Sequence, residues 1–174
     1  MQFAVKIKTM KTFQILSLLL VLFACQTAEE TKPVKVSIEQ NKAAFIQALT
    51  IHLNAVSQRD LPTLEASLSP KGDMHLILPQ SKMTTTVKGF MDYHRAWFEG
   101  GGEWTLDNEI VYSNVGEDLG FAVVEAVYKE PERDGKPYFN RMNVSYSLKK
   151  MDGKWYVVKD HMCSVAKSTD TDAR

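Results

Sequence analysis

The sequence predicts an α+β domain in which three helices from the N-terminal half pack on the concave face of a curved antiparallel sheet. Three observations support this fold class: an amphipathic helix near the start, a strand pair followed by another helix, and four long β-type runs towards the end. The last two runs each follow a turn that carries Asp-Gly, a pair typical of tight hairpins. Helices followed by adjacent antiparallel strands favour this class over an alternating parallel fold.

The first helix is expected from Ser37 to about Gln58. Ser37 and Gln40 form a capping-box pattern, and His52 lies on the edge of the apolar stripe, where we interpret it as a packed core histidine rather than a ligand. Pro62 can occupy the start of a short second helix. The apolar residues of the first helix recur at helical spacing; they are Phe45, Leu49, Leu53 and Val56.

The remaining elements follow from strand and helix patterns. Residues 73–79 and 83–89 have the β-branched and apolar content of a hairpin, and residues 90–98 place aromatic side chains on one helical face. The glycines at 100–102 end that helix rather than open one, so no phosphate site is expected there. Four strands of an antiparallel meander should follow, at 104–115, 121–130, 138–150 and 154–165.

Residues 1–24 are typical of a bacterial lipoprotein signal peptide. Lys11 precedes an apolar run that ends in Leu-Phe-Ala-Cys. This run is too short and too close to the N-terminus for a comfortable transmembrane span. Met10 alone begins a well-proportioned signal, so translation starting there is an alternative to Met1. A core helix or an uncleaved anchor is the competing interpretation of the same run.

Cys25 is the residue that the signal peptide would leave at the mature N-terminus. By resemblance to bacterial lipoproteins, Cys25 would carry the lipid, and residues 25–36 would be a polar tether between the membrane and the domain. Gln26 follows the cysteine, which in the enteric sorting pattern favours the outer membrane. We therefore expect a protein of the bacterial cell envelope, anchored at the outer membrane and facing the periplasm.

Charge and cysteine content exclude several classes. Three lysines leave with the signal peptide, so 18 basic residues remain against 21 acidic ones, a net charge of −3. Because no basic cluster with interleaved aromatic residues is present, nucleic acid is not an expected partner. Cys163 would have no disulfide partner once Cys25 is lipidated. The mature chain fits one domain at 37–165, followed by a disordered tail at 166–174.

Three passages support a family resemblance. They are DLPTLEASLSPKGDMHL after the first helix, TVKGFMDYHRAWF across a strand and helix, and DGKWYVVKDH near the end. With them, residues 37–165 resemble the nuclear transport factor 2-like superfamily, within its SnoaL-like and calcium/calmodulin-dependent kinase association-domain branch. The resemblance implies a cone with a mostly apolar pocket at its open end, and frequently a homodimer through the outer sheet face.

Acidic residues on the strands do not form an evident catalytic pair. Ketosteroid isomerase-like members of this superfamily place a carboxylate base and an acidic hydrogen-bond donor in the pocket. Strand alternation predicts that Asp107 and Glu109 face water, and Glu125 is interpreted as a solvated or interface carboxylate. Four scattered histidines without a paired carboxylate predict no metal site, and no cofactor is expected.

Basic, amide and aromatic residues are the better candidates for ligand binding. Alternation places Arg141 and Asn143 together on one strand face, and places His161 with Trp155 and Val157 on another. Asp160 would point the opposite way unless a bulge intervenes. Burial of Arg141 and His161 in one cavity would suit a ligand with a carboxylate or carbonyl end. The competing orientation, produced by a bulge or register slip, places Arg141 and Asn143 in solvent.

The third helix and the first hairpin contribute further candidates. Trp97 should form a wall of the cavity, and His94 lies in an apolar stripe, where a core histidine bonded to a backbone carbonyl is the simpler interpretation. His75 could meet His161 across the sheet. His161 and Cys163 share a strand face, but a nucleophile and its base would also need an oxyanion site. We therefore interpret His161 as lining the pocket and Cys163 as a small buried neighbour.

The functional hypothesis is a lipid-anchored protein that binds a small apolar or amphipathic ligand in its cone, with no evident catalysis. One alternative is an enzyme of isomerase or dehydratase type with a pocket histidine or carboxylate as general base. The other is a homodimeric interaction module that uses the outer sheet face. A cavity in which polar groups converge favours the enzyme, whereas a filled cone favours the interaction module.

Overall fold

The computed structural model describes residues 37–80, 82–100 and 102–169. The predictions for the signal peptide, for Cys25 and for the tether lie outside the described residues, as does most of the predicted tail. The elements, in chain order, are α2 (Ile38–Ser57), α3 (Leu61–Ala66), β1 (Asp73–Ile77), β2 (Met83–Thr86), α4 (Val87–Glu99), β3 (Thr105–Val115), β4 (Leu119–Arg133), β5 (Lys136–Met151) and β6 (Lys154–Lys167).

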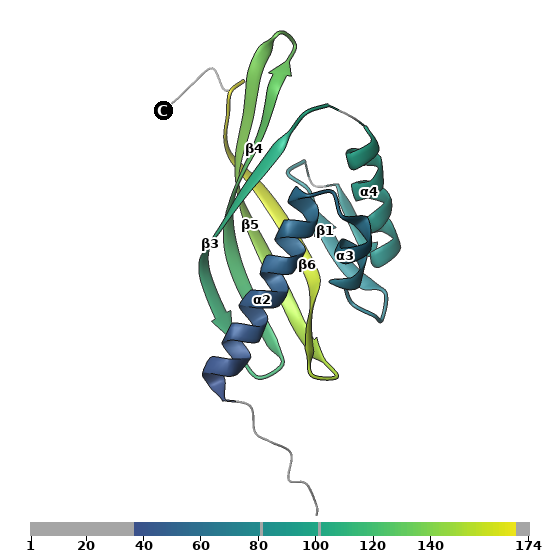
Figure 1. The fold of residues 1–174 in the computed structure, drawn as a ribbon, viewed down its shortest axis with the longest axis vertical. Coiled ribbons are helices and arrows are strands. Elements are labelled where there is room, and N and C mark those ends of the chain that lie inside the picture. Colours follow the sequence, from purple (N-terminus) through teal and green to yellow (C-terminus); the bar gives the residue numbers. More distant parts are fainter. Residues whose placement is uncertain (1–36, 81, 101, 170–174) are drawn as a thin grey trace, which may run out of the picture. The chain divides into compact units, whose positions relative to one another are not determined.

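The strands form one curved six-stranded sheet in the order β2-β1-β6-β5-β4-β3. Helices α2 and α4 lie on the same side of this sheet, over its concave face (Figure 1). The predicted α+β class is therefore confirmed, but the sheet is mixed rather than wholly antiparallel. The exception is the pairing of β1 with β6, which is parallel, because the last strand of the meander returns to the edge of the first hairpin.

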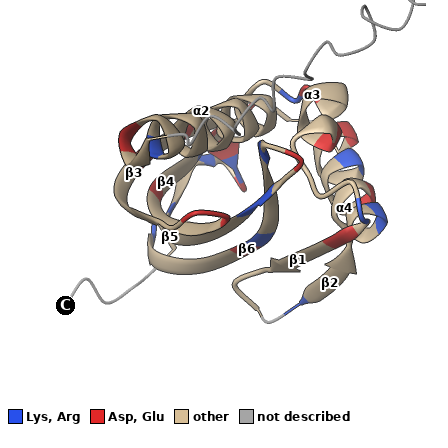
Figure 2. Cartoon of the chain, turned by 90° about the horizontal axis from the view of Figure 1, so that it is seen from below, with Lys and Arg blue, Asp and Glu red and all other residues tan. Residues whose placement is uncertain are grey.

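Viewed along the curve, the sheet wraps partly around the space beneath α2 (Figure 2). Positions of Lys and Arg are mixed with positions of Asp and Glu along the described ribbon (Figure 2). None of the helices among the described residues is long and apolar enough to cross a membrane.

Helix α2 begins and packs as its sequence predicts. The Ser37 side chain accepts a hydrogen bond from the Gln40 amide at 3.1 Å, and the Gln40 side chain accepts one from the Ser37 amide at 3.0 Å. The ring of Phe45 is fully buried and meets Trp155 edge-on, with centroids 5.3 Å apart. Gly120 on β4 permits this packing, since a Cβ atom there would lie 2.7 Å from the Phe45 ring.

Helix α4 begins three residues earlier than predicted. Thr86 caps it: its side chain accepts a hydrogen bond from the Gly89 amide at 3.0 Å. The strand pattern predicted through residue 89 therefore ends at Thr86, because a threonine cap outweighs the β-branched content of the residues around it. Gly100 ends the helix, as the glycine run predicts.

Strand β6 contains a bulge that changes which residues face the core. Opposite β5, Ser147 pairs with Lys159 whereas Leu148 pairs with Val157, so Val158 is the additional residue. After the bulge the alternation is inverted. Trp155 and Val157 are buried before the bulge, and the next buried residue after it is Asp160.

Strand β6 also continues beyond the predicted end of the domain at residue 165. Ala166 pairs with Arg141, and Lys167 pairs with Asn140, after a second bulge. The predicted tail is thus ordered at its first two residues, because the long β5 strand offers backbone partners to them.

Candidate functional site

A cavity of about 510 Å³ lies between α4 and the concave face of the sheet. We call it the inner cavity. Its size falls within the range of small-molecule sites. Its lining is divided between two kinds of side chain. Apolar or aromatic ones come from Val56, Leu78, Trp97, Leu106, Ala126, Tyr128, Met142, Val144 and Met162; polar or charged ones include Gln80, Tyr93, His94, Asn108, Glu130, Arg133, Asn140, Tyr146, Asp160, Ser164 and Lys167.

Asp160 is the ionisable group that stands out in this cavity. Its side chain is 2% exposed, and its Oδ1 atom has no hydrogen-bond partner among the described residues. Burial therefore raises the pKa of the Asp160 carboxyl to about 7, since a charged carboxylate loses its hydration there without compensation. At neutral pH this carboxyl is divided between its protonated and ionised forms.

Two tyrosines of the cavity lie close enough to Asp160 for its charge to raise their pKa values. Burial first, and then the Asp160 charge, raise the pKa of Tyr146 well above its ordinary value. The same two causes raise the pKa of Tyr93. Both hydroxyl groups therefore keep their protons at neutral pH and can donate hydrogen bonds.

His94 lines the cavity as a neutral imidazole. Its Nδ1 donates a hydrogen bond to the Phe90 carbonyl at 2.9 Å, so Nε2 is the unprotonated nitrogen. Burial lowers the pKa of His94 to about 4. The predicted core histidine bonded to a backbone carbonyl is confirmed, and its role towards a ligand stays a prediction.

A second buried histidine, His52, packs behind the cavity wall. Its Nδ1 lies 2.8 Å from the Ser67 hydroxyl, which itself donates to the Leu64 carbonyl, so the imidazole donates to Ser67. Burial and then the charge of His94 lower the pKa of His52 to about 3. The prediction of a packed core histidine is confirmed for this residue.

Aromatic rings form one wall of the inner cavity. Trp97 stacks on Trp104 with ring centroids 4.6 Å apart, and Tyr128 lies 6.0 Å from Trp97. Burial, followed by a hydrogen bond to Glu130, raises the pKa of Tyr128 to about 12. The Tyr128 hydroxyl donates to Glu130 at 2.5 Å. Trp97 lines the cavity, and its role in ligand binding stays a prediction.

The inward orientation predicted for Arg141, Asn143, His161 and His75 is wrong. All four side chains are exposed and none lines the inner cavity. His161 lies opposite Ile77 rather than His75 in the β1–β6 pair. On β5, the inner face is taken by alternating apolar and aromatic residues, which gain more from burial than Arg141 and Asn143 would; they are Met142, Val144, Tyr146 and Leu148.

The bulge at Val158 explains the error on β6. It turns Asp160 inward and His161 outward, the reverse of simple alternation from Trp155. Cys163 shares a face with His161, as predicted, but this face is the outer one, so Cys163 is exposed rather than buried. Cys163 is thereby excluded as a nucleophile of the inner cavity.

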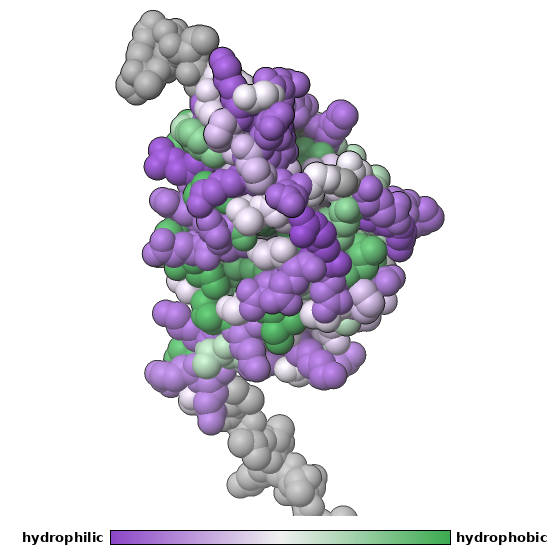
Figure 3. All heavy atoms as spheres, turned by 45° about the horizontal axis from the view of Figure 1, so that its top comes forward, coloured by the Kyte–Doolittle hydropathy of each residue, from purple (hydrophilic) through white to green (hydrophobic). Residues whose placement is uncertain are grey.

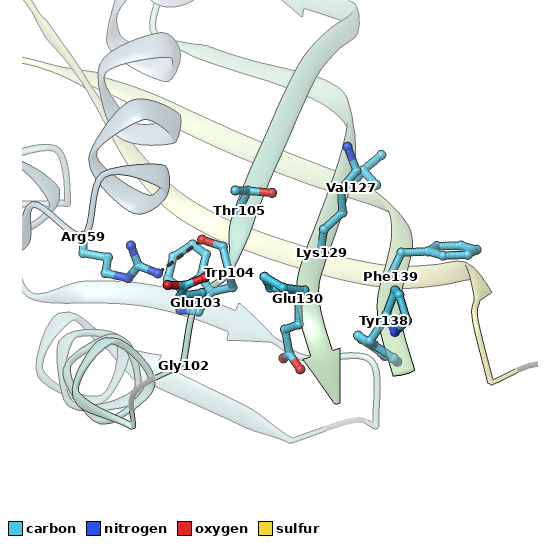
Figure 4. Close-up of a pocket in the computed structure, with 12 residues that line it drawn as sticks. Arg59, Gly102, Glu103, Trp104, Thr105, Val127, Lys129, Glu130, Tyr138 and Phe139 are labelled. Atoms are coloured by element: carbon cyan, nitrogen blue, oxygen red, sulfur yellow. Dashed lines mark hydrogen bonds between the residues drawn. The ribbon is translucent and has the colours of Figure 1, made fainter. Parts of the chain in front are cut away.

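A second, larger groove of about 810 Å³ lies beside the ends of β3, β4 and β5 (Figure 4). Most of its lining residues are exposed, Glu103 among them, and three of its charged groups are already paired. Arg59 donates to the Trp104 carbonyl and lies over the Trp104 ring, Lys129 pairs with Asp107 at 2.7 Å, and Glu130 pairs with Arg133. Among the described residues, this groove therefore offers no buried, unpaired ionisable group comparable with Asp160.

The outer face of the sheet exposes several large apolar side chains. Tyr112 and Phe121 are 52% and 45% exposed, and their rings lie 5.8 Å apart. Hydrophobic side chains reach the surface on the side of the molecule where β3 and β4 lie (Figure 3). The predicted homodimer through this face stays a prediction. Among the described residues, no group of three or more His, Cys, Asp or Glu side chains could hold a metal ion.

Comparison with known families matches residues 46–167 to the SnoaL-like domain. The match covers more than half of the sequence, and the chain belongs to this family. None of the curated proteins matches the sequence significantly.

Solved structures with the same fold include members of the NTF2-like superfamily. A candidate dehydratase of the NTF2-like family from Streptomyces avermitilis is 12% identical with a TM-score of 0.65, over 74% of this chain and 99% of that one. A hexachlorocyclohexane dehydrochlorinase (LinA) of type 2 is 13% identical with a TM-score of 0.64, over 73% and 86%. The association domain of C. elegans CaMKII is 17% identical with a TM-score of 0.55, over 72% and 96%. At these identities the likeness establishes the fold alone.

Proposed function

We propose that the protein is an enzyme that moves a proton on a small apolar or amphipathic molecule held in the inner cavity, with Asp160 as the general base. The observation that carries this proposal is the Asp160 carboxyl, which is buried and unpartnered at Oδ1 among the described residues, in a cavity that is lined in part by apolar and aromatic side chains. The reaction class is isomerase-like or lyase-like, in which a carbon loses a proton.

The protonation states of the cavity suit this chemistry. A base with a pKa near the working pH is partly ionised and still basic enough to take a proton and return it, and the pKa of Asp160 is about 7. The hydroxyl groups of Tyr93 and Tyr146, held neutral by their raised pKa values, can donate to an oxygen that gains negative charge as the proton leaves.

His94 is the less suitable base. Its pKa is lowered to about 4, so the imidazole is a weak base that does not retain an added proton at neutral pH. Its Nδ1 hydrogen is already donated to Phe90, so it has no second N–H for an oxyanion. We therefore assign proton removal to Asp160 rather than to a histidine.

Two relatives support the reaction class through their names. One is named a candidate dehydratase and the other a dehydrochlorinase. The loss of water or of hydrogen chloride requires a proton to leave carbon, which is the step that Asp160 could perform here.

Proton exchange from 4-acetylbiphenyl in D₂O, followed by NMR, tests the proposal. The wild-type protein should accelerate exchange of the acetyl protons, with a rate that rises with pH through about 7, the pKa of Asp160. Asp160→Asn should lower the rate at least ~100-fold, because the general base is removed. Asp107→Asn, at an exposed carboxylate on β3, is the matched control and should leave the rate unchanged.

The alternative of ligand binding without catalysis has a distinct outcome in the same experiment. If wild-type protein and Asp160→Asn exchange the acetyl protons at equal rates while both bind the ketone, Asp160 is not a general base. The inner cavity would then serve binding or transport alone.

We further propose that the protein acts at a membrane of the bacterial envelope, anchored by a lipid on Cys25. Support comes from the apolar run that ends in Leu-Phe-Ala-Cys. Cys25→Ser should release the protein from the membrane fraction or leave an unprocessed precursor, as measured by fractionation and intact mass. Cys163→Ser, at an exposed cysteine of the folded domain, is the control. Processing of Cys25→Ser at the same site with unchanged membrane association would contradict the anchor.

A further inference from the structure

The inner cavity contains a second polar position that the proton-transfer step does not use. Asn140 on β5 and Ser164 on β6 both line the cavity. The Asn140 Oδ1 and Ser164 Oγ atoms are buried, and neither has a hydrogen-bond partner among the described residues. Buried polar atoms are normally paired, and leaving them unpaired is costly. Two such atoms in one cavity indicate a place where a ligand supplies the partners.

The strand register places these two residues close together. Ser164 pairs with Met142, and Asn140 is the next inward-facing residue along β5, so Asn140 and Ser164 are diagonal neighbours on the inner face. Both lie away from the Asp160 end. Between Asp160 and Ser164 the pairing with β5 is regular, and four residues of extended strand correspond to about 13 Å.

The wall between the two polar positions is apolar. Met162 lies between Asp160 and Ser164 on the inner face of β6, and Met142 and Val144 face the cavity from β5 beside it. A molecule that reaches from one position to the other therefore passes over side chains that offer no hydrogen bonds.

We propose that Asn140 and Ser164 form a subsite for a hydroxyl group of the substrate. The Asn140 oxygen accepts a hydrogen bond and the Ser164 hydroxyl can donate one, which matches the donor and the acceptor of a single hydroxyl group. The substrate class is then an elongated, mostly apolar molecule with a hydroxyl group at the end remote from the carbon that loses its proton. This inference rests on the proposed function for the position of the reacting carbon.

Two matched ketones test the subsite. They are 4-acetylbiphenyl and 4-acetyl-4′-hydroxybiphenyl, in which two linked phenyl rings separate the acetyl group from the hydroxyl. Equilibrium dialysis at pH 7 should show the hydroxylated ketone binding the wild-type protein about tenfold more tightly, since a buried polar pair left unmatched weakens binding by about that factor. Ser164→Ala and Asn140→Leu should each reduce this preference, and the double variant should remove it.

The controls come from the same strands. Cys163→Ala and Asn143→Leu change exposed residues of β6 and β5 on the outer face and should leave the preference intact. Asp160→Asn should also retain it, so loss of proton exchange and loss of hydroxyl selection are distinguishable results. Equal binding of the two ketones by the wild-type protein, a preference that survives in the double variant, or binding of neither ketone would overturn the subsite. Ser164→Ala removes one oxygen only and keeps the test available if Asn140→Leu fails to fold.

Discussion

At pH 8 the Asp160→Asn variant should unfold at a higher temperature than the wild-type protein. Burial raises the pKa of the Asp160 carboxyl from 3.8 to about 7, so at pH 8 the folded protein holds a carboxylate that would be better solvated in the unfolded chain. A shift of this size corresponds to a cost on the order of a few kcal/mol. The neutral amide of asparagine has a similar shape and avoids that cost.

The sign of the pH dependence follows from the two pKa values. Below pH 3.8 the carboxyl is protonated in both states, and its ionisation does not affect the free energy of unfolding. Between pH 3.8 and about 7 the unfolded chain loses the proton first, so stability falls as the pH rises. The gain from Asp160→Asn should accordingly be small at pH 4 and largest at pH 8.

Thermal unfolding at pH 4 and pH 8 measures this difference. Asp107→Asn replaces an exposed carboxylate that pairs with Lys129, and it should not show the gain at pH 8. An Asp160→Asn variant that is no more stable than wild type at pH 8 would mean that the carboxylate is stabilised in the folded protein, and Asp160 would then be a poor candidate for the base.

A stabilising substitution at this position would also fit the proposed chemistry. Active sites often retain groups that cost folding free energy because the reaction needs them. Asp160→Asn should then increase stability and decrease proton exchange together. Replacing a residue with only a structural role would decrease both stability and proton exchange, or would change neither.

The fold could be predicted because its signals are local and repeated. The capping box at Ser37, the apolar spacing from Phe45 and the Asp-Gly turns each occupy only a few residues, and the structure contains all of them. At the turns, Asp134 and Asp152 adopt positive φ angles, followed by glycines that do the same. The parallel pairing of β1 with β6 was not predictable in this way, because it joins residues far apart in the chain.

The site was harder to predict because it depends on one additional residue. Val158 has the β-branched side chain of an ordinary strand residue, and no glycine marks the bulge. Counting alternate residues from Trp155 therefore placed His161 inside and Asp160 outside. A signal was present on β5, where Met142, Val144 and Tyr146 alternate regularly; this pattern favoured an outward Arg141 over the inward one that we predicted.

Lowering the pH from 7.5 to 4.5 should remove the stability linked to the two buried histidines, and His52 should account for a large part of that loss, while protonation of Asp160 acts in the opposite direction. Burial lowers the pKa of His52 from 6.5 to about 3 and that of His94 to about 4. As the pH falls below 6.5, the histidines bind protons in the unfolded chain but not in the folded protein, so stability falls. For His52 alone the loss by pH 4.5 amounts to about 2–3 kcal/mol.

His52→Leu should therefore lose less stability than the wild-type protein over this pH range, as measured by urea unfolding at both pH values. Leucine can pack against Phe90 and Tyr146, which flank the imidazole, and the Ser67 hydroxyl keeps its bond to the Leu64 carbonyl. Loss of the hydrogen bond to Ser67 lowers stability equally at both pH values. The difference in stability between the two pH values therefore measures the contribution of His52 protonation alone. His161→Leu, at an exposed histidine, should lose as much as wild type. Equal losses in His52→Leu and wild type would show that His52 becomes protonated without unfolding. This would require a route for water to Nε2, which has no hydrogen-bond partner among the described residues.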